Sequence, residues 1–343
     1  MKKQIVLFVS ILLSATFFAA YANAQERTPF MTRTFSASSI KQVEATTSGG
    51  SLTLSGDANS NATVEVYVSR SDWSAEKIKQ FLNDNYTIDI KVENGKLYAV
   101  AKQKGSFFNW NNQGLSISFK ISVPKQVDSN LQTSGGSIHI SGLAGSQDFK
   151  TSGGSLSVDN VSGKTVGATS GGSISLTNSK DDIKLSTSGG SITAKDCTGT
   201  IGLNTSGGSL SLNNLSGNVS AKTSGGSVTA NNIDGTFITG TSGGSVNLSG
   251  ISGNVDASTS GGSMNVKITS VSDYVKLSNS GSLNLSLPAG KNYNLDIKAN
   301  KVETSGMKDF QGNMESNSVV GTTGNGGPQI YLRSSQKVRL SFE

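Results

Sequence analysis

Apolar and small polar residues alternate in short stretches that recur every eighteen residues through the middle of the chain. An apolar residue directly follows each Gly-Gly-Ser segment, and a second follows two positions later, as in Ile138 and Ile140. This period of two predicts a β-strand with one buried and one exposed face. The first apolar column consists of Ile138, Leu156, Ile174, Ile192, Leu210, Val228, Val246 and Met264, and the second of Ile140, Val158, Leu176, Ala194, Leu212, Ala230, Leu248 and Val266.

The remainder of each repeat contains a third apolar column, a glycine column and a second short alternation. Leu143 and Gly145 begin these two columns, and Ile201 with Leu203 is one example of the later alternation. Each unit therefore predicts a strand, a glycine corner, a second strand and a second corner. We expect Ser-Gly-Gly to form a corner with positive φ. The segment TSGGS begins without slippage at Thr133, Thr151, Thr169, Thr187, Thr205, Thr223, Thr241 and Thr259.

Such a repeat favours an all-β chain, a parallel β-solenoid with two short strands in each 18-residue coil. Equivalent strands stack about 4.8 Å apart, so eight coils rise about 38 Å. The usual crossover rule favours a right-handed solenoid. One coil cannot offset the entropy of ordering its own backbone, so the array needs neighbours and caps. The short period leaves a thin apolar interior without room for a ligand cavity.

The flanks of the repeat predict caps. We divide the chain into residues 25–132 as an elaborated first coil and cap, 133–287 as the repeat solenoid, and 288–343 as degenerate coils with a C-terminal cap. The N-terminal cap contains a helix at about 72–83, with Ser71 or Asp72 as its N-cap. A β-hairpin at about 88–101 follows, because Asn-Gly favours a tight primed turn. We expect the strands 329–333 and 337–342 to close the C-terminal end.

Residues 1–24 predict a signal peptide. A positive start is followed by an apolar run from Ile5 to Ala20, and Ala22-Asn23-Ala24 fits a cleavage site. The mature chain would begin at Gln25, and an uncleaved membrane anchor is the alternative. No later apolar run is long enough to span a bilayer once the signal is removed. We therefore expect an exported protein at the cell surface, in the periplasm or outside the cell.

Several segments together resemble a known bacterial family. Thr47–Ser55 (TSGGSLTLS) precedes a long insertion, Leu115–Val123 (LSISFKISV) leads into Val123-Pro124, and Thr133–Ser141 (TSGGSIHIS) opens the regular repeat. This order of parts resembles the bacterial putative-adhesin family of unknown function, whose members are exported β-strand repeat proteins. The resemblance covers about 42–342. It implies a β-solenoid with an envelope or surface role, and it supplies no catalytic residues.

The charge of the repeats argues against a nucleic-acid partner. The chain has a formal net charge of +6, but residues 133–277 contain eight Lys, eight Asp and no Arg. Binding to a phosphate backbone requires clustered Lys and Arg. We therefore expect no nucleic-acid partner and look instead to a surface glycan or an envelope protein.

Candidate catalytic, metal and cofactor groups are sparse. His139, the only histidine, stands between two apolar positions and should point into solvent, so we expect no Ser/His/Asp triad. Cys197, the only cysteine, falls in the third apolar column and should be buried as a small hydrophobe. The Asp residues occupy different columns, which fits neither paired catalytic acids nor a calcium-binding nonapeptide solenoid. We expect no catalytic residues, no metal and no cofactor.

An aromatic segment, Ser106–Asn112, is the strongest recognition candidate in the sequence. Phe107, Phe108 and Trp110 lie among Asn residues and could stack on sugar rings or contact a protein partner. They could equally pack against the cap helix, and the sequence leaves both alternatives open.

The sequence thus favours a non-enzymatic exported solenoid, an adhesin whose polar faces contact other cells or a matrix. The alternative is an envelope component that senses stress or acts as a scaffold through a protein partner, with the aromatic segment as its contact. A polysaccharide-acting enzyme is the least favoured hypothesis, because no pair of acids recurs at a fixed separation.

Overall fold

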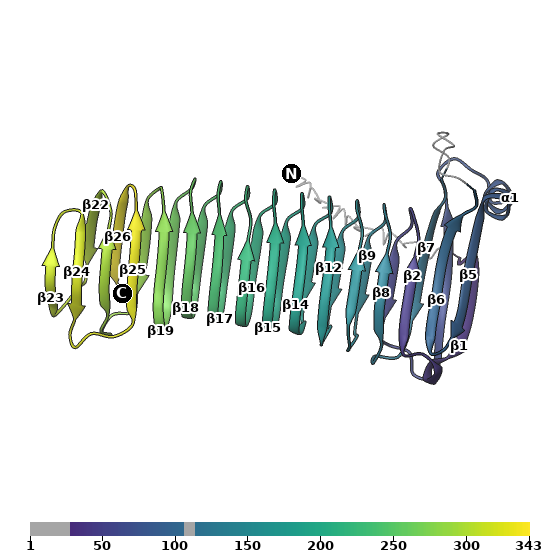
Figure 1. Ribbon diagram of the computed structural model, residues 1–343, viewed down its shortest axis with the longest axis horizontal. Coiled ribbons are helices and arrows are strands. Elements are labelled where there is room, and N and C mark those ends of the chain that lie inside the picture. The colour runs from purple at the N-terminus through teal and green to yellow at the C-terminus, as the bar shows by residue number, and fades with distance from the viewer. Residues whose placement is uncertain (1–27, 106–113) are drawn as a thin grey trace, which may run out of the picture.

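The computed structural model describes residues 28–105 and 114–343, and in them the chain forms an elongated, nearly all-β rod (Figure 1). It contains 26 strands and a single α-helix in these residues. Strands lie across the long axis of the rod, and most neighbours pair in parallel. The predicted parallel β-solenoid is therefore confirmed.

The strands form two stacks, which we call face A and face B. From the N-terminal end, face A contains β1 (Met31–Ser36), β4 (Asn61–Ser69), β7 (Ser116–Ser122), β3 (Leu52–Ser55), β9 (Ile138–Ser141), β11 (Leu156–Asp159), β13 (Ile174–Thr177), the first halves of β15 (Ile192–Thr205), β16 (Leu210–Lys222), β17 (Val228–Thr241), β18 (Val246–Thr259) and β19 (Met264–Asn279), then β20 (Leu283–Leu287), β26 (Lys337–Phe342) and β22 (Lys301–Ser305). Face B contains β5 (Tyr86–Glu93), β6 (Lys96–Gln103), β2 (Gln42–Thr46), β8 (Asp128–Gln132), β10 (Gln147–Lys150), β12 (Lys164–Thr169), β14 (Lys180–Thr187), the second halves of β15–β19, then β25 (Gln329–Ser334), β21 (Asn294–Lys298), β24 (Ser318–Thr323) and β23 (Phe310–Met314).

The inward columns of both faces form one continuous core. Residues of the three predicted apolar columns are buried, and Cys197 is fully buried among them. Burial raises the pKa of the Cys197 thiol, and its Sγ lies 3.1 Å from the carbonyl oxygen of Lys195. Early coils have two separate strands, whereas from Ile192 onward the two strands of a coil join into one bent strand.

Two corners of the coils from Ile138 to Gly253 adopt left-handed backbone. The predicted glycine column adopts positive φ, for example 119° at Gly199 and 107° at Gly217, and Asp181 takes its place in one coil with φ 81°. A second left-handed corner, which the sequence analysis missed, lies between the second and third apolar columns. Asn214 holds this corner with φ 54° and Asp196 with φ 55°. Asn and Asp tolerate this region better than other non-glycine residues.

The TSGGS corner differs from the prediction, because neither of its glycines adopts a left-handed φ. The second glycine is required by contact between coils instead. A Cβ added to Gly208 would lie 2.0 Å from the carbonyl oxygen of Gly190, whereas one added to Gly207 would meet its nearest atom at an ordinary 3.5 Å. The backbones of successive coils approach so closely at this point that only glycine fits.

The threonine that opens TSGGS bonds each coil to the one before it. Thr205 Oγ1 donates to the carbonyl oxygen of Gly190 at 2.8 Å and accepts the backbone N–H of Gly208 at 3.2 Å. The same pair of bonds recurs from Thr133 to Thr259. A buried hydroxyl therefore satisfies one orphan carbonyl and one orphan N–H at every turn of the solenoid.

The N-terminal end is closed by antiparallel strands and the helix. On face A, β4 and β1 run antiparallel beyond β7, and on face B β5 pairs antiparallel with β6 through the predicted hairpin. Both turn residues, Asn94 and Gly95, have positive φ. The helix α1 (Ala75–Asn85) packs beside β5 (Figure 1). It begins later than predicted because Ser74, not Ser71 or Asp72, caps it by accepting the N–H of Lys77.

Near each end of the rod, one coil lies between two coils that are not its neighbours in the sequence order. The coil of β2 and β3 is flanked by β6–β7 on one side and β8–β9 on the other. The coil of β25 and β26 lies between β19–β20 and β21–β22. The strands predicted to close the C-terminal end are therefore one coil inside it. In the sequence β21 and β22 come first, and β25 and β26 then insert between them and the coil of β19 and β20.

An ion cluster on β22 and β26 stabilises this last coil. Glu303 contacts Lys301 at 3.1 Å, and Lys337 and Arg339 from the neighbouring strand also pair with it. Hydrogen bonds from Lys337 and Lys301 lower the pKa of Glu303 to about 2. These contacts bond the outer strand of face A to the coil that was inserted beneath it.

Gly208→Ala should destabilise the solenoid by about 3 kcal/mol, because the new Cβ would meet a backbone carbonyl that cannot move without displacing a coil. Gly207→Ala is the matched control and should cost less than about 1 kcal/mol. The free energy of unfolding in urea measures both. Equal losses would contradict the close-contact explanation.

Thr205→Val should cost about 1–3 kcal/mol, because it leaves the Gly190 carbonyl and the Gly208 N–H without a partner. Thr205→Ser keeps the hydroxyl and should lose only about 1 kcal/mol through its missing methyl group. Urea unfolding of the two variants side by side tests the ladder. A serine variant as unstable as the valine variant would show that packing, not hydrogen bonding, holds this corner.

Glu303→Gln should lower stability at pH 7 and have a shrinking effect as the pH falls. The pKa of Glu303, about 2, lies below the ordinary value of 4.5. Its contribution is therefore present above about pH 4.5 and is lost as the pH falls toward 2. Urea midpoints across this range measure the gap between wild type and variant. Glu315→Gln removes a carboxylate of the same end that has no ion pair in the described residues, and it should show no such trend.

Candidate functional site

The outward surface of face A carries an unbroken row of polar side chains, which we call the central row. Each member is the register partner of the next, so the row follows the long axis of the rod. The central row consists of Thr53, His139, Ser157, Ser175, Thr193, Ser211, Thr229, Asn247, Asn265, Asn284, Arg339 and Glu303.

Face B has no comparable surface. Its equivalent outward row includes Val166 and Ile238, and the side chain of Ile238 is 38% exposed. Face A is therefore the more uniform hydrogen-bonding surface.

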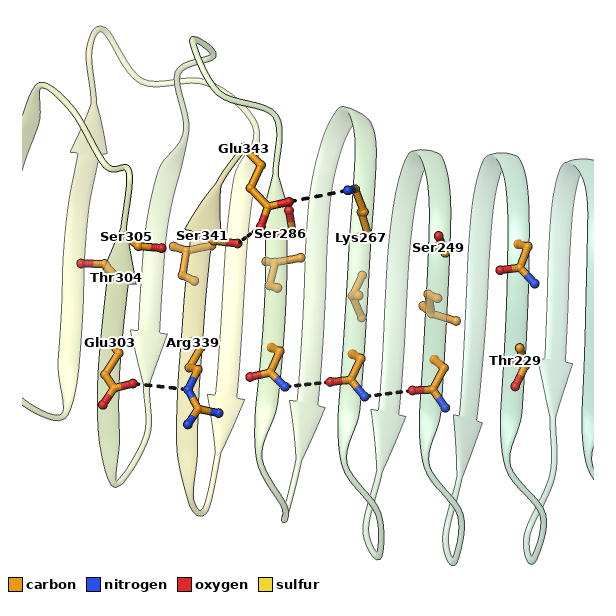
Figure 2. A pocket seen from close by; sticks show the side chains of 18 residues that line it. Thr229, Ser249, Lys267, Ser286, Glu303, Thr304, Ser305, Arg339, Ser341 and Glu343 are labelled. Atoms are coloured by element: carbon orange, nitrogen blue, oxygen red, sulfur yellow. Dashed lines mark hydrogen bonds and ion pairs between the residues drawn. The ribbon is translucent and has the colours of Figure 1, made fainter.

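A groove of about 700 Å³ lies over face A near its C-terminal end. Outward residues of β17–β20, β26 and β22 line it, and we call it the C-terminal groove (Figure 2). It is open to solvent and lies outside the apolar core. The side chains that reach into it are those of Asn, Ser, Thr, Lys, Arg and Glu residues.

Three asparagines on successive coils form the floor of the groove, and we call them the amide row. Asn265 Nδ2 donates to Asn247 Oδ1 at 2.9 Å, and Asn284 Nδ2 donates to Asn265 Oδ1 at 2.7 Å. All the amides point the same way along the rod (Figure 2). Each Asn Nδ2 carries two hydrogens, so the row keeps N–H donors for a ligand.

Ion pairs flank the amide row on two sides. Lys267 Nζ lies 3.6 Å from Glu343 Oε2, and Arg339 Nε lies 3.4 Å from Glu303 Oε2. The pKa of Glu343 is lowered by hydrogen bonds from Ser286 and Ser341 and by the charge of Lys267. Both carboxylates are therefore held ionised near neutral pH.

Of the residues singled out from the sequence, the structure describes His139 and Cys197, and neither lines the groove. His139 points outward as predicted and belongs to the central row, far from the groove along the rod. Phe107, Phe108 and Trp110 lie outside the described residues, as does the signal segment 1–24. The helix of the described residues is too short and too polar to cross a bilayer.

Part of this groove could have been predicted from the sequence. Asn247, Asn265 and Asn284 replace the Ser or Thr of earlier coils in one outward column, which the repeat alignment could have shown. The sequence could not place Arg339 and Glu303 beside them. In space β26 lies between β20 and β22, although it comes after both in the sequence.

The groove is suited to hydrogen bonding with a polar ligand. Within the described residues, no three His, Cys, Asp or Glu side chains gather in a way that could hold a metal ion. The amides provide donors and acceptors, and the cations provide charge. This chemistry recognises hydroxyls and carboxylates.

Solved structures similar to this chain have low identity. A putative cell adhesion protein from Clostridium sporogenes has 8% identity and a TM-score of 0.21, with 91% of this chain and 98% of that chain covered. A putative adhesin from Bacteroides fragilis has 12% identity and a TM-score of 0.26, with 91% and 96% covered. A putative lipid binding protein from Parabacteroides distasonis has 14% identity and a TM-score of 0.32, with 92% and 97% covered. At these scores, what those proteins bind has no bearing on this chain.

No curated protein matches the chain. Residues 173–336 match the sequence profile of Toastrack DUF4097, and this region contains the later repeats, the groove residues of β17–β20 and β22, and most of the C-terminal cap. The match agrees with the stacked coils of the structure and with the resemblance carried by the TSGGS segments. Over these residues the chain is similar to the Toastrack DUF4097 family.

Proposed function

We propose that this protein is an exported, non-enzymatic adhesion protein that binds a polar polymer along the outward surface of face A. The observation that supports this most strongly is the central row, in which every side chain from Thr53 to Glu303 is polar and in register. An extended polymer lying along the rod would meet one hydrogen-bonding side chain about every 4.8 Å.

The C-terminal groove is the main binding site in this proposal. The rest of the central row is a flat strip of Ser and Thr, whereas the groove combines concave shape, amides and charge. Concave sites with a few placed polar groups bind more tightly than flat surfaces, because more of the ligand is desolvated. The remaining coils hold this groove away from the N-terminal end of the rod (Figure 1).

The state of the groove's charges supports a binding role over catalysis. A general acid or base works best with a pKa near the operating pH. The pKa of Glu303 is about 2 and that of Glu343 is lowered, and both carboxylates are ion-paired. They are poor proton donors near neutral pH and serve better to orient Lys267 and Arg339.

Export rests on the signal segment 1–24 predicted from the sequence, which places the protein in the envelope or outside the cell. A rod built from hydrogen-bonded coils, with few exposed apolar side chains among the described residues, suits a surface that meets water and polysaccharides.

Purified protein should bind at least one polysaccharide on an array of neutral and acidic glycans. Asn265→Ala should weaken that binding about tenfold in biolayer interferometry, because it removes one donor and one acceptor from the centre of the amide row. Asn213→Ala is the matched control, since Asn213 is an exposed asparagine of face A outside the groove.

The control should bind like wild type. The proposal would be contradicted if the protein bound no glycan on the array, or if Asn265→Ala left the affinity unchanged.

A further inference from the structure

The amide row ends in an acceptor without a partner. Asn284 Nδ2 is bonded to Asn265, but Asn284 Oδ1 is buried and accepts no hydrogen bond from the described residues. Buried acceptors in native proteins are usually satisfied, and each exception requires an explanation. The row therefore ends with this buried oxygen at the position next to Arg339 in the central row.

The next residue in the central row brings unused donors to the same place. Asn284 on β20 is the register partner of Arg339 on β26 (Figure 2). Arg339 Nε lies 3.4 Å from Glu303 Oε2, and the hydrogen bonds of the described residues include none from its two Nη atoms. The Nη groups carry four N–H donors in the planar fork that matches a carboxylate.

The surrounding charge favours an anionic ligand. Lys267 and Arg339 line this end of the groove, Lys301 and Lys337 pair with Glu303 beside it, and these four cationic side chains outnumber the side-chain carboxylates of Glu303 and Glu343. The carboxylates fix the geometry of these cations without neutralising all of them. An acidic group would therefore be attracted to the end of the amide row.

We infer that the C-terminal groove binds an acidic saccharide, with a uronate carboxylate on the Arg339 Nη groups and neighbouring sugar hydroxyls on the amide row. A uronate presents a carboxylate and hydroxyls on one ring, which matches a guanidinium beside a row of amides. Further sugar hydroxyls then accept the spare N–H donors of Asn265 and Asn247 along the rod. This inference rests on the proposed function, because it names the class of polymer that the groove holds.

A saccharide fits the groove better than an acidic peptide. The outward side chains of the groove are polar or charged, and its apolar lining residues, Leu248, Val266, Leu285 and Leu340, are buried in the core. An Asp or Glu side chain of a peptide also lacks hydroxyls beside its carboxylate for the spare N–H donors of the amide row.

The test compares uronate polymers with their methyl esters, which keep the backbone and remove the charge. Polygalacturonate, alginate and hyaluronate, each with its carboxyl-methylated form, are titrated against wild type and Arg339→Gln by isothermal titration calorimetry. At least one acidic polymer should bind, and its methyl ester should bind wild type about 10–100-fold more weakly, as expected for lost charge-assisted hydrogen bonds. Arg339→Gln should weaken the acid by a similar factor and the ester hardly at all, so that the two changes are coupled.

Lys298→Gln is the control variant, because it removes one positive charge from the same end of the rod on face B, outside the groove. It should change the affinity less than twofold, and circular dichroism verifies the fold of each variant. This inference is overturned if the methyl ester binds wild type as tightly as the acid, or if Arg339→Gln weakens the binding of acid and ester equally. The proposed binding of a polysaccharide would stand in either case. Polyglutamate that binds as tightly as the uronates through Arg339 overturns the saccharide class. Absence of binding to every glycan overturns the proposed function itself.

Discussion

The close contact between successive TSGGS corners is the constraint on which the rest of the structure depends. At that point one carbonyl oxygen lies where a Cβ would be, so the second glycine cannot be replaced without moving a coil. The threonine hydroxyl then bonds the two coils through the carbonyl and N–H groups that this contact leaves unpaired. Because the bonds recur from Thr133 to Thr259, this corner holds successive coils at the same offset, and the strands of both faces keep one register.

The ends of the rod are stabilised in a different way, because a stacked coil at an end has only one neighbouring coil. The first complete coil and the last one each lie between two others, so neither chain terminus of the solenoid can peel away alone. Antiparallel strands lie outside them and break the parallel pattern that another chain could extend. The ion cluster of Glu303 adds a bond between the inserted coil and the strand beyond it.

The sequence could predict whatever depends on alternation within one coil. The inward columns, the burial of Cys197 and the Asn94-Gly95 turn are all local patterns, and the structure confirms them. It could not predict the φ of the TSGGS glycines, because the closeness of the next coil is invisible in a single repeat. The helix began late because Ser74 competes with Asp72 as a cap, and only packing decides between them. The groove escaped prediction because Arg339 reaches it by an out-of-order coil.

The same register that builds the core also makes the outward surface easy to change. A substitution at one outward position lies directly above the equivalent position of the neighbouring coil, so three Ser or Thr positions that became Asn produce a bonded row. The core columns do not need to change for this to occur, because outward and inward residues alternate along each strand. A polar ladder must end somewhere, however, and its last amide leaves an acceptor unpaired unless another group follows. In this chain the next group is the guanidinium of Arg339. Because every amide of the row donates in the same direction, the unpaired oxygen of Asn284 lies at the end of the row beside this positive charge.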